Sequence, residues 1–542
     1  MKKWLVVLLA GTLAFAGGCA GAGSGAATQT KKEELTTPAD PFYKYPEPVT
    51  LTLAKPINPE DKSLPSGDTV DNNQFTRYMF EKTNIAFDYA LTAKTGDPFT
   101  QKVQVAIASN DIPDVMVVGE KELRQMVEAD QLEDMTQVYE KYASQQIKDF
   151  YATTDGKALD KATFDGKLMA IPNIVPQGDA PYFLWVRKDW LDQLGLQEPK
   201  TLDDIAAVAK AIIEQDPDGN GKADTIGLPG SPIDLVHGEN GFASIFSYYN
   251  AYPDYWIKDK EGNVSYGSIQ PEVKEALAKL REWYSSGLID KEFALRKEAY
   301  ELMSGGKAGM FFGPWWLPWG ALGDAVKNDP KANWIALAAP LDAEGNFKTH
   351  TVPVSNSFVV VKKNIAHPEA VMIAINTTVA GERGTDPDAK GLDNRVNPIY
   401  WPIRVVIENA DTVTRKHDML KLVMDGESKP EDMIPEMQDI YAKAKAADFD
   451  PVMDLGAWQP YYSYMIGSAP LNGPLKPQEN LFTSITKTME LKNATLDKME
   501  KETFLKIIMG IEPLDSFDTF VEQWTKLGGD QITKEVRESV AE

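Results

Sequence analysis

The chain has 542 residues, of which 43% are hydrophobic and 25% charged. This is ordinary globular usage and excludes a wholly disordered chain or a collagen-like repeat, while the length predicts two or more lobes with a sizeable core. There are 80 acidic and 56 basic residues, a net charge of −24, and so negative a surface disfavours nucleic-acid binding. The single cysteine excludes an intrachain disulfide and a cysteine-based zinc site.

The first 18 residues predict a signal peptide. Two lysines precede an apolar run over residues 4–16, which is too short for a membrane-spanning helix. Small residues then lead to Cys19 in a sequence that resembles the lipobox of bacterial lipoproteins, except that Ala16 stands where leucine is usual. The resemblance implies that Cys19 is acylated and becomes the first mature residue. The alternative is an ordinary secretory peptide with an incidental cysteine.

Residues 19–45 predict a flexible tether, because they are rich in Gly, Ala, Ser and Thr and offer little to bury. A G-x-G-x-G string in this segment follows no strand and opens no helix, which excludes a dinucleotide-binding interpretation. No later apolar stretch approaches 18 residues. We therefore expect a chain anchored by its end, with no membrane-spanning segment.

The first part of the mature chain alternates strand and helix patterns. Alternating or β-branched segments predict strands, and apolar residues at helical spacing predict helices. The predicted elements are strands over residues 49–54, 85–91 and 115–118, and helices over residues 71–83 and 99–108. This alternation favours an α/β lobe with a mostly parallel sheet.

The pattern then repeats. Residues 182–187 predict a strand and residues 188–194 a helix that ends at Gly195, while Thr201 with Asp204 predicts a capped start for a helix that continues over residues 206–214. Later expectations are a strand over residues 356–361, a helix opening at residue 368, and polar amphipathic helices from about residue 480 onward.

Several segments coincide, in order, with one protein family. They are residues 108–114, 165–172, 186–195 followed by 199–203, 306–310, 511–518 and 527–530. Together they resemble the family 1 extracellular solute-binding proteins of bacterial ABC importers, in the long lipoprotein branch that includes LplA-like and alginate-oligosaccharide-binding proteins. Each motif alone is weak, and their order carries the resemblance, which runs from about Pro46 to the C-terminus.

The resemblance implies a two-lobed α/β fold of the periplasmic-binding-protein type (type II), with mixed, mostly parallel sheets flanked by helices and a cleft between the lobes. We place chain crossings near residues 171–172 and 351–357. The expected N-terminal lobe comprises residues 46–172 and 353–400, and the expected C-terminal lobe comprises residues 173–352 and 401–542. Closure around a ligand would bring side chains of both lobes onto it.

An acidic loop over residues 216–224 predicts a calcium site. Its candidate ligands fall at positions 1, 3, 5, 7 and 9 of an EF-hand-like loop, with Gly221 at the sharp turn and only the backbone carbonyl of Lys222 at position 7. They are Asp216, Asp218, Asn220, Lys222 and Asp224. Position 12 departs from the pattern, because Gly227 replaces the bidentate glutamate, so water or Thr225 must complete the shell. We expect a structural ion, and the alternative is a solvated acidic turn.

Clustered aromatic residues are the candidates for holding a sugar, because indole and phenol faces match the C–H faces of pyranose rings. Prolines and glycines around the first cluster predict a loop or a single turn. The clusters are Trp315, Trp316 and Trp319; Trp458 and Tyr461, with Tyr462 and Tyr464 beside them; Tyr400 and Trp401; and Tyr182 and Trp185, just past the first crossing. For most single aromatics the alternative is the hydrophobic core.

Three polar residues complete the candidate set. Asp114, at a turn entering a strand, is expected either to bind sugar hydroxyls or to cap that turn, and Asn356 lies at the second crossing. Arg187 is expected to form a salt bridge at the end of its strand rather than to contact a ligand.

No catalytic motif stands out, since the sequence contains no G-x-S-x-G elbow, metal-binding histidine pair or P-loop. We expect a binding protein that takes an oligosaccharide or other small solute and delivers it to ABC permease subunits. It would be a monomer outside the cell, held by its lipid on the outer face of a membrane, in a Gram-positive envelope. The alternatives are a secreted carbohydrate-active hydrolase or lyase, and a surface lipoprotein for adhesion or peptide sensing.

Overall fold

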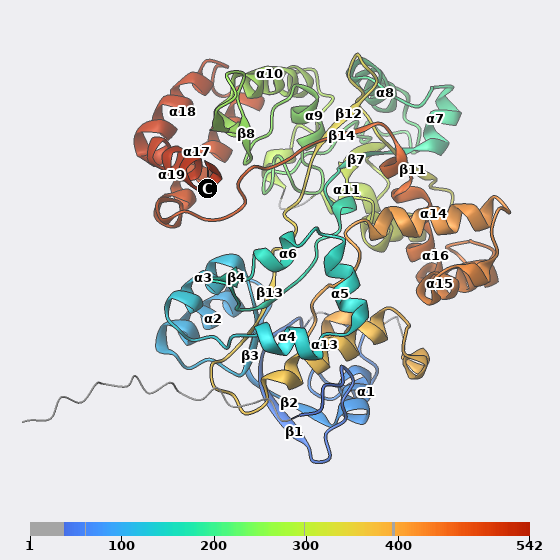
Figure 1. Ribbon diagram of the computed structural model, residues 1–542. Helices are drawn as coiled ribbons and strands as arrows, with labels where there is room; N and C mark the ends of the chain where they lie inside the picture. Colours follow the sequence, from blue (N-terminus) through green and yellow to red (C-terminus); the bar gives the residue numbers. More distant parts are fainter. Residues whose placement is uncertain (1–36, 60, 297–298, 393–395, 542) are drawn as a thin grey trace, which may run out of the picture. The chain divides into compact units, whose positions relative to one another are not determined.

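The computed structural model describes residues 37–59, 61–296, 299–392 and 396–541, and Figure 1 shows the path of the chain. Its larger sheet has five strands in the order β2-β1-β3-β13-β6. These strands are β1 (Val49–Ile57), β2 (Ile85–Lys94), β3 (Val115–Val118), β6 (Ile171–Pro172) and β13 (Phe358–Val361). β1 pairs in parallel with β2 and β3, whereas β13 runs antiparallel to β3 and β6.

Helices accompany this sheet, and three of them, α1, α2 and α13, were predicted from the sequence. α1 begins after Asn73, whose side chain accepts hydrogen bonds from the backbone of Phe75 and Thr76, and it ends at Asn84 in the left-handed conformation. α13 is buried along most of its length, because it is apolar on all sides. The helices of this region are α1 (Gln74–Thr83), α2 (Asp97–Ser109), α3 (Glu120–Glu128), α4 (Thr136–Tyr142), α5 (Gln145–Ala152), α6 (Lys157–Asp160) and α13 (Pro368–Glu382).

A second sheet of three strands is entirely antiparallel, in the order β10-β7-β11. Its strands are β7 (Phe183–Arg187), β10 (Met310–Gly313) and β11 (Trp334–Leu337). Of these two sheets, only the β2-β1-β3 part is therefore parallel, so the predicted mixed sheets are found but they are less parallel than expected. Apolar patterning identifies a buried strand but not the direction of its partner, and the long connections between these three strands allow either direction.

The helix ends predicted near the second sheet are found in the structure. Thr201 and Asp204 form a reciprocal capping box at the start of α8, and α7 ends at Gly195 with a positive φ of 66°. Apart from α13, the α-helices that follow β6 in the described part of the chain are α7 (Lys188–Leu194), α8 (Leu202–Gln215), α9 (Ala243–Tyr248), α10 (Pro271–Ser285), α11 (Tyr300–Ser304), α12 (Ala321–Asn328), α14 (Thr412–Met424), α15 (Pro435–Ala446), α16 (Leu455–Tyr462), α17 (Lys487–Ile508), α18 (Ser516–Trp524) and α19 (Asp530–Ala541). Within the described residues, no helix combines the length and the apolarity needed to cross a membrane.

Short strands complete the fold. β12 pairs in parallel with β14, and two hairpins join β4 to β5 and β8 to β9. Their bounds are β4 (Thr163–Phe164), β5 (Lys167–Leu168), β8 (Trp256–Lys258), β9 (Val264–Tyr266), β12 (Phe347–His350) and β14 (Leu475–Gln478). Asp165 and Gly166 have positive φ values between β4 and β5, as the predicted turn requires.

The two segments predicted as crossings lie side by side. The amide of Asn173 donates to the carbonyl of Ser357 and the amide of Val175 to that of Val354, while the amide of Ile174 donates to the carbonyl of Val406. Three stretches of chain are thus joined next to β6. The strands of the larger sheet precede this point or follow residue 357, and those of the second sheet lie between residues 183 and 337.

Candidate functional site

The segment we call the tryptophan loop, residues 313–320, connects β10 to α12. Its prolines and glycines limit it to one short turn, Leu317–Trp319, as the sequence predicted. The three indoles differ in exposure: Trp315 is buried, Trp316 is half-buried and Trp319 is 42% exposed. The exposed surface of Trp319 makes it the indole of this loop that a ligand could contact without a change in the loop.

Tyr464 completes an aromatic cluster, by which we mean Trp315, Trp316, Trp319 and Tyr464. The Tyr464 ring lies 4.9 Å from Trp315 at a tilted angle and 5.7 Å from Trp319 edge-on. Tyr464 belongs to a turn of π-helix, Ser463–Gly467, that presses against the tryptophan loop. A side chain at Gly467 would place its Cβ 2.1 Å from the Trp315 carbonyl oxygen, so this close approach requires glycine.

Asp179 holds the cluster from the other side, and the sequence analysis did not single it out. The Trp315 indole Nε1 donates to Asp179 Oδ1 over 2.8 Å. Burial raises the pKa of Asp179 to about 6, although the indole hydrogen bond acts to lower it. Its position in the sequence could have indicated it. Asp179 lies in a polar turn that contains a glycine, between two buried segments and just past the first predicted crossing.

A buried ionic network, which we define as Arg383, Glu408, Lys416 and Glu436, supports Tyr464. Lys416 Nζ lies 3.4 Å from the Tyr464 hydroxyl and 2.9 Å from a carboxylate oxygen of each glutamate, and Arg383 Nη1 lies 2.7 Å from Glu408 and 3.1 Å from Glu436. Burial alone would raise the pKa of Glu408, yet the charges of Arg383 and Lys416 hold it below its usual value. Each buried cation is thus matched by carboxylates.

Five other predicted ligand aromatics are buried side chains in this structure, the core position that the sequence left open as their alternative. They share burial and packing against internal rings or backbone, and they are Trp185, Tyr400, Trp401, Trp458 and Tyr461. Trp401 stacks on Phe75 at 4.6 Å, and the Trp185 indole donates to the Pro314 carbonyl, so that Trp185 supports the start of the tryptophan loop. The presence of an aromatic residue in the sequence does not tell a core side chain from a ligand contact, because both sites use the same side chains.

The remaining predicted contacts are distributed over several elements. Tyr182 is half-buried and stacks on His350, with ring centroids 5.8 Å apart. Asp114 links β1 to the residues before β3, since its Oδ2 accepts from the Thr52 amide over 2.8 Å, a contact between strands rather than a cap of its own turn. Asn356 is exposed, and its Oδ1 accepts from Asn173 between the joined segments.

The interpretation of Arg187 as a structural ion pair is confirmed. The guanidinium lies 2.5 Å from Asp189 and 3.0 Å from Asp329, and the Trp190 ring lies 4.5 Å from its Cζ. Its side chain is almost fully buried, so the pairing is part of the core.

The acidic loop over residues 216–224 is arranged around the Asn220 amide. The Asn220 Nδ2 donates to Asp218 Oδ2 over 2.7 Å and to Asp224 Oδ1 over 3.0 Å, while the Lys222 amide donates to Asn220 Oδ1. Asp216 Oδ1 is buried and has no hydrogen-bond partner. An orphaned carboxylate oxygen beside two further carboxylates suits a hard cation. Within the described residues, however, no three acidic, histidine or cysteine side chains converge as a ready metal site.

The departure at position 12 has a steric cause. A Cβ at Gly227 would lie 2.8 Å from the Ala209 side chain on α8 and 2.9 Å from the Leu288 carbonyl oxygen, so a glutamate cannot fit there. The Thr225 hydroxyl donates to the Ile212 carbonyl, and Lys307 Nζ lies 3.3 Å from Asp224 Oδ2. Lys307 thus partly neutralises the loop.

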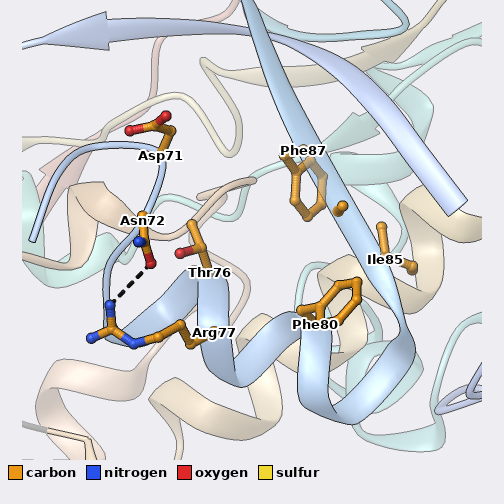
Figure 2. A pocket seen from close by; sticks show the side chains of 8 residues that line it. Asp71, Asn72, Thr76, Arg77, Phe80, Ile85 and Phe87 are labelled. Carbon is orange, nitrogen blue, oxygen red and sulfur yellow. Dashed lines mark hydrogen bonds between the residues drawn. The ribbon is translucent and has the colours of Figure 1, made fainter. Parts of the chain in front are cut away.

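Two cavities lie away from the predicted ligand residues. One of about 240 Å³ is formed by α1 and β2, where Figure 2 shows Arg77 extending toward Asn72 on one side and the rings of Phe80 and Phe87 on the other. The other, of about 470 Å³, lies along α15 and includes Tyr441. Neither contains a residue of the aromatic cluster. Cys19 and the predicted signal peptide lie outside the described residues.

The sequence profile described as bacterial extracellular solute-binding protein matches residues 61–376, more than half of the chain. The chain belongs to this family. The polygalacturonan/rhamnogalacturonan-binding protein YtcQ of Bacillus subtilis (strain 168) is 28% identical over 58% of this chain and 57% of its own length. The fructooligosaccharide substrate-binding protein FusA of Streptococcus pneumoniae is 28% identical over 53% of this chain and 52% of its own. The matches thus span a little over half the length of these solute-binding relatives.

Solved structures show the same fold. The alginate-binding protein AlgQ2 without calcium ion superposes with a TM-score of 0.61, at 17% identity, over 92% of this solute-binding protein and 99% of AlgQ2. An EF-hand mutant of S. pneumoniae FusA in complex with fructo-nystose gives a TM-score of 0.61, at 18% identity, over 91% and 99% of the two chains. The predicted two-lobed α/β fold is therefore confirmed.

Proposed function

We propose that this protein is the substrate-binding lipoprotein of an ABC importer and that it binds an oligosaccharide at the aromatic cluster. Family membership and the exposed face of Trp319 carry the proposal, because Trp319 packs edge-on against Trp315, whose indole donates to Asp179. Indole faces pack on sugar rings, and a carboxylate accepts their hydroxyls. The relatives support a sugar ligand, since YtcQ and FusA are named for binding polygalacturonan or rhamnogalacturonan and fructooligosaccharide.

The proposed lobes keep the predicted boundaries, residues 46–172 with 353–400 and residues 173–352 with 401–542. The distribution of strands between the two sheets and the hydrogen bonds around Asn173 support this division. A ligand held between the lobes would favour their closure, and the closed form would dock on the permease. The ligand leaves unaltered, so we assign no catalytic residue and expect no bond cleavage.

The anchoring proposal rests on the lipobox-like sequence before Cys19. An acylated Cys19 would hold a monomer on the outer face of a Gram-positive membrane, with residues 19–45 as the tether. A single acyl chain binds membranes reversibly, whereas two or more anchor stably. Metabolic labelling with an alkyne fatty acid should mark the wild-type chain and leave a Cys19→Ser variant unmarked.

We also propose that residues 216–224 bind calcium. The side-chain oxygens of Asp216, Asp218 and Asp224 would hold the ion, with Asn220 turned to present Oδ1 and the backbone carbonyl of Lys222 as a further ligand. The calcium-related descriptions of AlgQ2 and of the FusA EF-hand mutant support this assignment. Bound calcium supplies positive charge that offsets the mutual repulsion of the three carboxylates.

The test of the sugar site compares two equally exposed aromatic residues. Trp319 is 42% exposed in the tryptophan loop, and Phe80 is 43% exposed at the cavity of α1 and β2. Isothermal titration against an oligosaccharide panel should show Trp319→Ala weakening the best ligand about tenfold to a hundredfold, with Phe80→Ala unchanged. Loss of binding only in Phe80→Ala would show that the sugar site is the cavity of α1 and β2.

Product analysis of the same mixtures should return every glycan intact, and cleaved glycans would favour the hydrolase or lyase alternative.

A further inference from the structure

The charge presented at the aromatic cluster is that of Asp179. Its short 3₁₀ turn, Gln177–Asp179, is fixed on α14, because a Cβ at Gly178 would lie 2.9 Å from Val413 and 3.0 Å from Leu471. The Gln177 amide donates to the Ala410 carbonyl over 2.8 Å. The position of the Asp179 carboxylate beside Trp315 is therefore fixed by the packing of its turn.

Within the described residues, no ion pair joins this carboxylate to a lysine, arginine or histidine. Burial raises its pKa to about 6, and the hydrogen bond from the Trp315 indole acts to lower it. The indole engages Oδ1, and no protein hydrogen bond is recorded to Oδ2 within the described residues. A half-buried carboxylate with one engaged oxygen keeps its negative charge available to a ligand.

Other carboxylates act on Tyr182, which follows Asp179 closely in the chain. The pKa of the Tyr182 hydroxyl is raised first by burial and then by the charges of Asp234, Glu239 and Asp179. Three acidic side chains thus act on one hydroxyl that closely precedes β7. The local field is negative for any ligand that reaches the aromatic cluster from Tyr182.

The cations behind the cluster are already matched. Lys416 and Arg383 act on Tyr464, but both are buried and each lies within about 3 Å of Glu408 and Glu436. A uronate entering here would meet carboxylates with no free ammonium or guanidinium group within the described part of the cluster.

We propose that the ligand is an uncharged oligosaccharide and that Asp179 is the residue that excludes acidic sugars. This inference rests on the proposed sugar-binding function and specifies its substrate class. Sugar hydroxyls donate to Asp179 Oδ2, whereas a uronate carboxylate would be brought against it without a counter-charge. We expect a uronate oligosaccharide to bind at least about tenfold more weakly than its neutral counterpart.

Matched glycan pairs test the proposal with the purified full chain. Neutral oligosaccharides and uronate oligosaccharides of the same linkage and of three to six units are titrated calorimetrically against wild type and Asp179→Asn. Asparagine keeps an acceptor oxygen for the Trp315 indole but removes the charge. We expect neutral glycans to be the best wild-type ligands, and the neutral-to-uronate ratio to fall several-fold in Asp179→Asn.

Asp234→Asn is a second variant that lowers the same negative field without touching the aromatic cluster, and it should reduce the ratio by a smaller factor. Melting temperatures confirm that both variants fold. The inference is overturned if a uronate is the best ligand and Asp179→Asn leaves its affinity unchanged, an outcome that retains the sugar-binding function. Binding of no glycan at all would overturn the proposed function as well.

Discussion

The tryptophan loop and the segment containing Tyr400 and Trp401 look alike in the sequence and have different environments in the structure. Trp401 is 1% exposed and stacks on Phe75 of α1, whereas Trp319 is 42% exposed beside Tyr464. The two tryptophans differ in what they pack against. Trp401 covers the apolar face of α1, whereas Trp319 follows Pro318 in the short turn between β10 and α12. Aromatic content alone predicts neither outcome.

The largest expected effect is on stability and falls on the buried member of the comparison. Trp401→Ala should lower the free energy of unfolding by about 3–5 kcal/mol, because it leaves a cavity against Phe75 and Tyr78. Trp319→Ala should change it by less than about 1 kcal/mol. Urea denaturation measures both values, and equal losses would remove the distinction between core and binding face.

Calcium should have the next largest effect. At a calcium concentration about a hundredfold above the dissociation constant, binding to the folded state alone adds about 2.7 kcal/mol of stability. The melting temperature should rise by several degrees with calcium and fall again with EDTA. Asp216→Asn removes the orphaned carboxylate oxygen and should abolish the response, with Asp342→Asn, in a different acidic turn, as its control. Identical melting curves with and without calcium would count against the site.

The smallest expected effect is a pH dependence of sugar affinity. Hydroxyls that donate to Asp179 stabilise its charged form, so binding lowers its pKa from about 6 in the free protein. Affinity should be constant above pH 6 and fall severalfold as the pH drops below it. Other ionisable side chains lie near Tyr182: His350 stacks on its ring, His237 contacts His350, and the charges of Asp234 and Glu239 act on its hydroxyl.

Asp179→Asn separates the contribution of Asp179 from the contributions of these neighbours. Titration calorimetry at a series of pH values should show a flatter profile in the variant. A profile of unchanged shape would assign the pH dependence to the other groups.

Much of the fold could be predicted from the sequence because local chemistry determines it. Alternation identified β1 and β2, and the Thr201 box and Gly195 marked the ends of α8 and α7. Strand direction was not predictable, because the residues of β7, 183–187, contain no pattern that indicates that β10 and β11 run antiparallel to it.

The candidate site was only partly predictable. The tryptophan loop was identified by its composition, but Asp179 was not, because its role depends on Trp315, which lies far along the chain. The acidic loop shows the same limit. Its ligand spacing was readable, whereas the close contact of Gly227 with Ala209 that excludes a glutamate at position 12 arises only from packing on α8.

The position of β13 has a consequence for how the chain is made. β13 pairs with β3, yet Phe358 follows Val118 by 240 residues, and all of the second sheet is encoded between them. During synthesis, the edge of β3 that will pair with β13 therefore has unpaired backbone hydrogen-bonding groups until β13 has been made. The four residues of β3 form a short edge, which limits pairing with other nascent chains during this time.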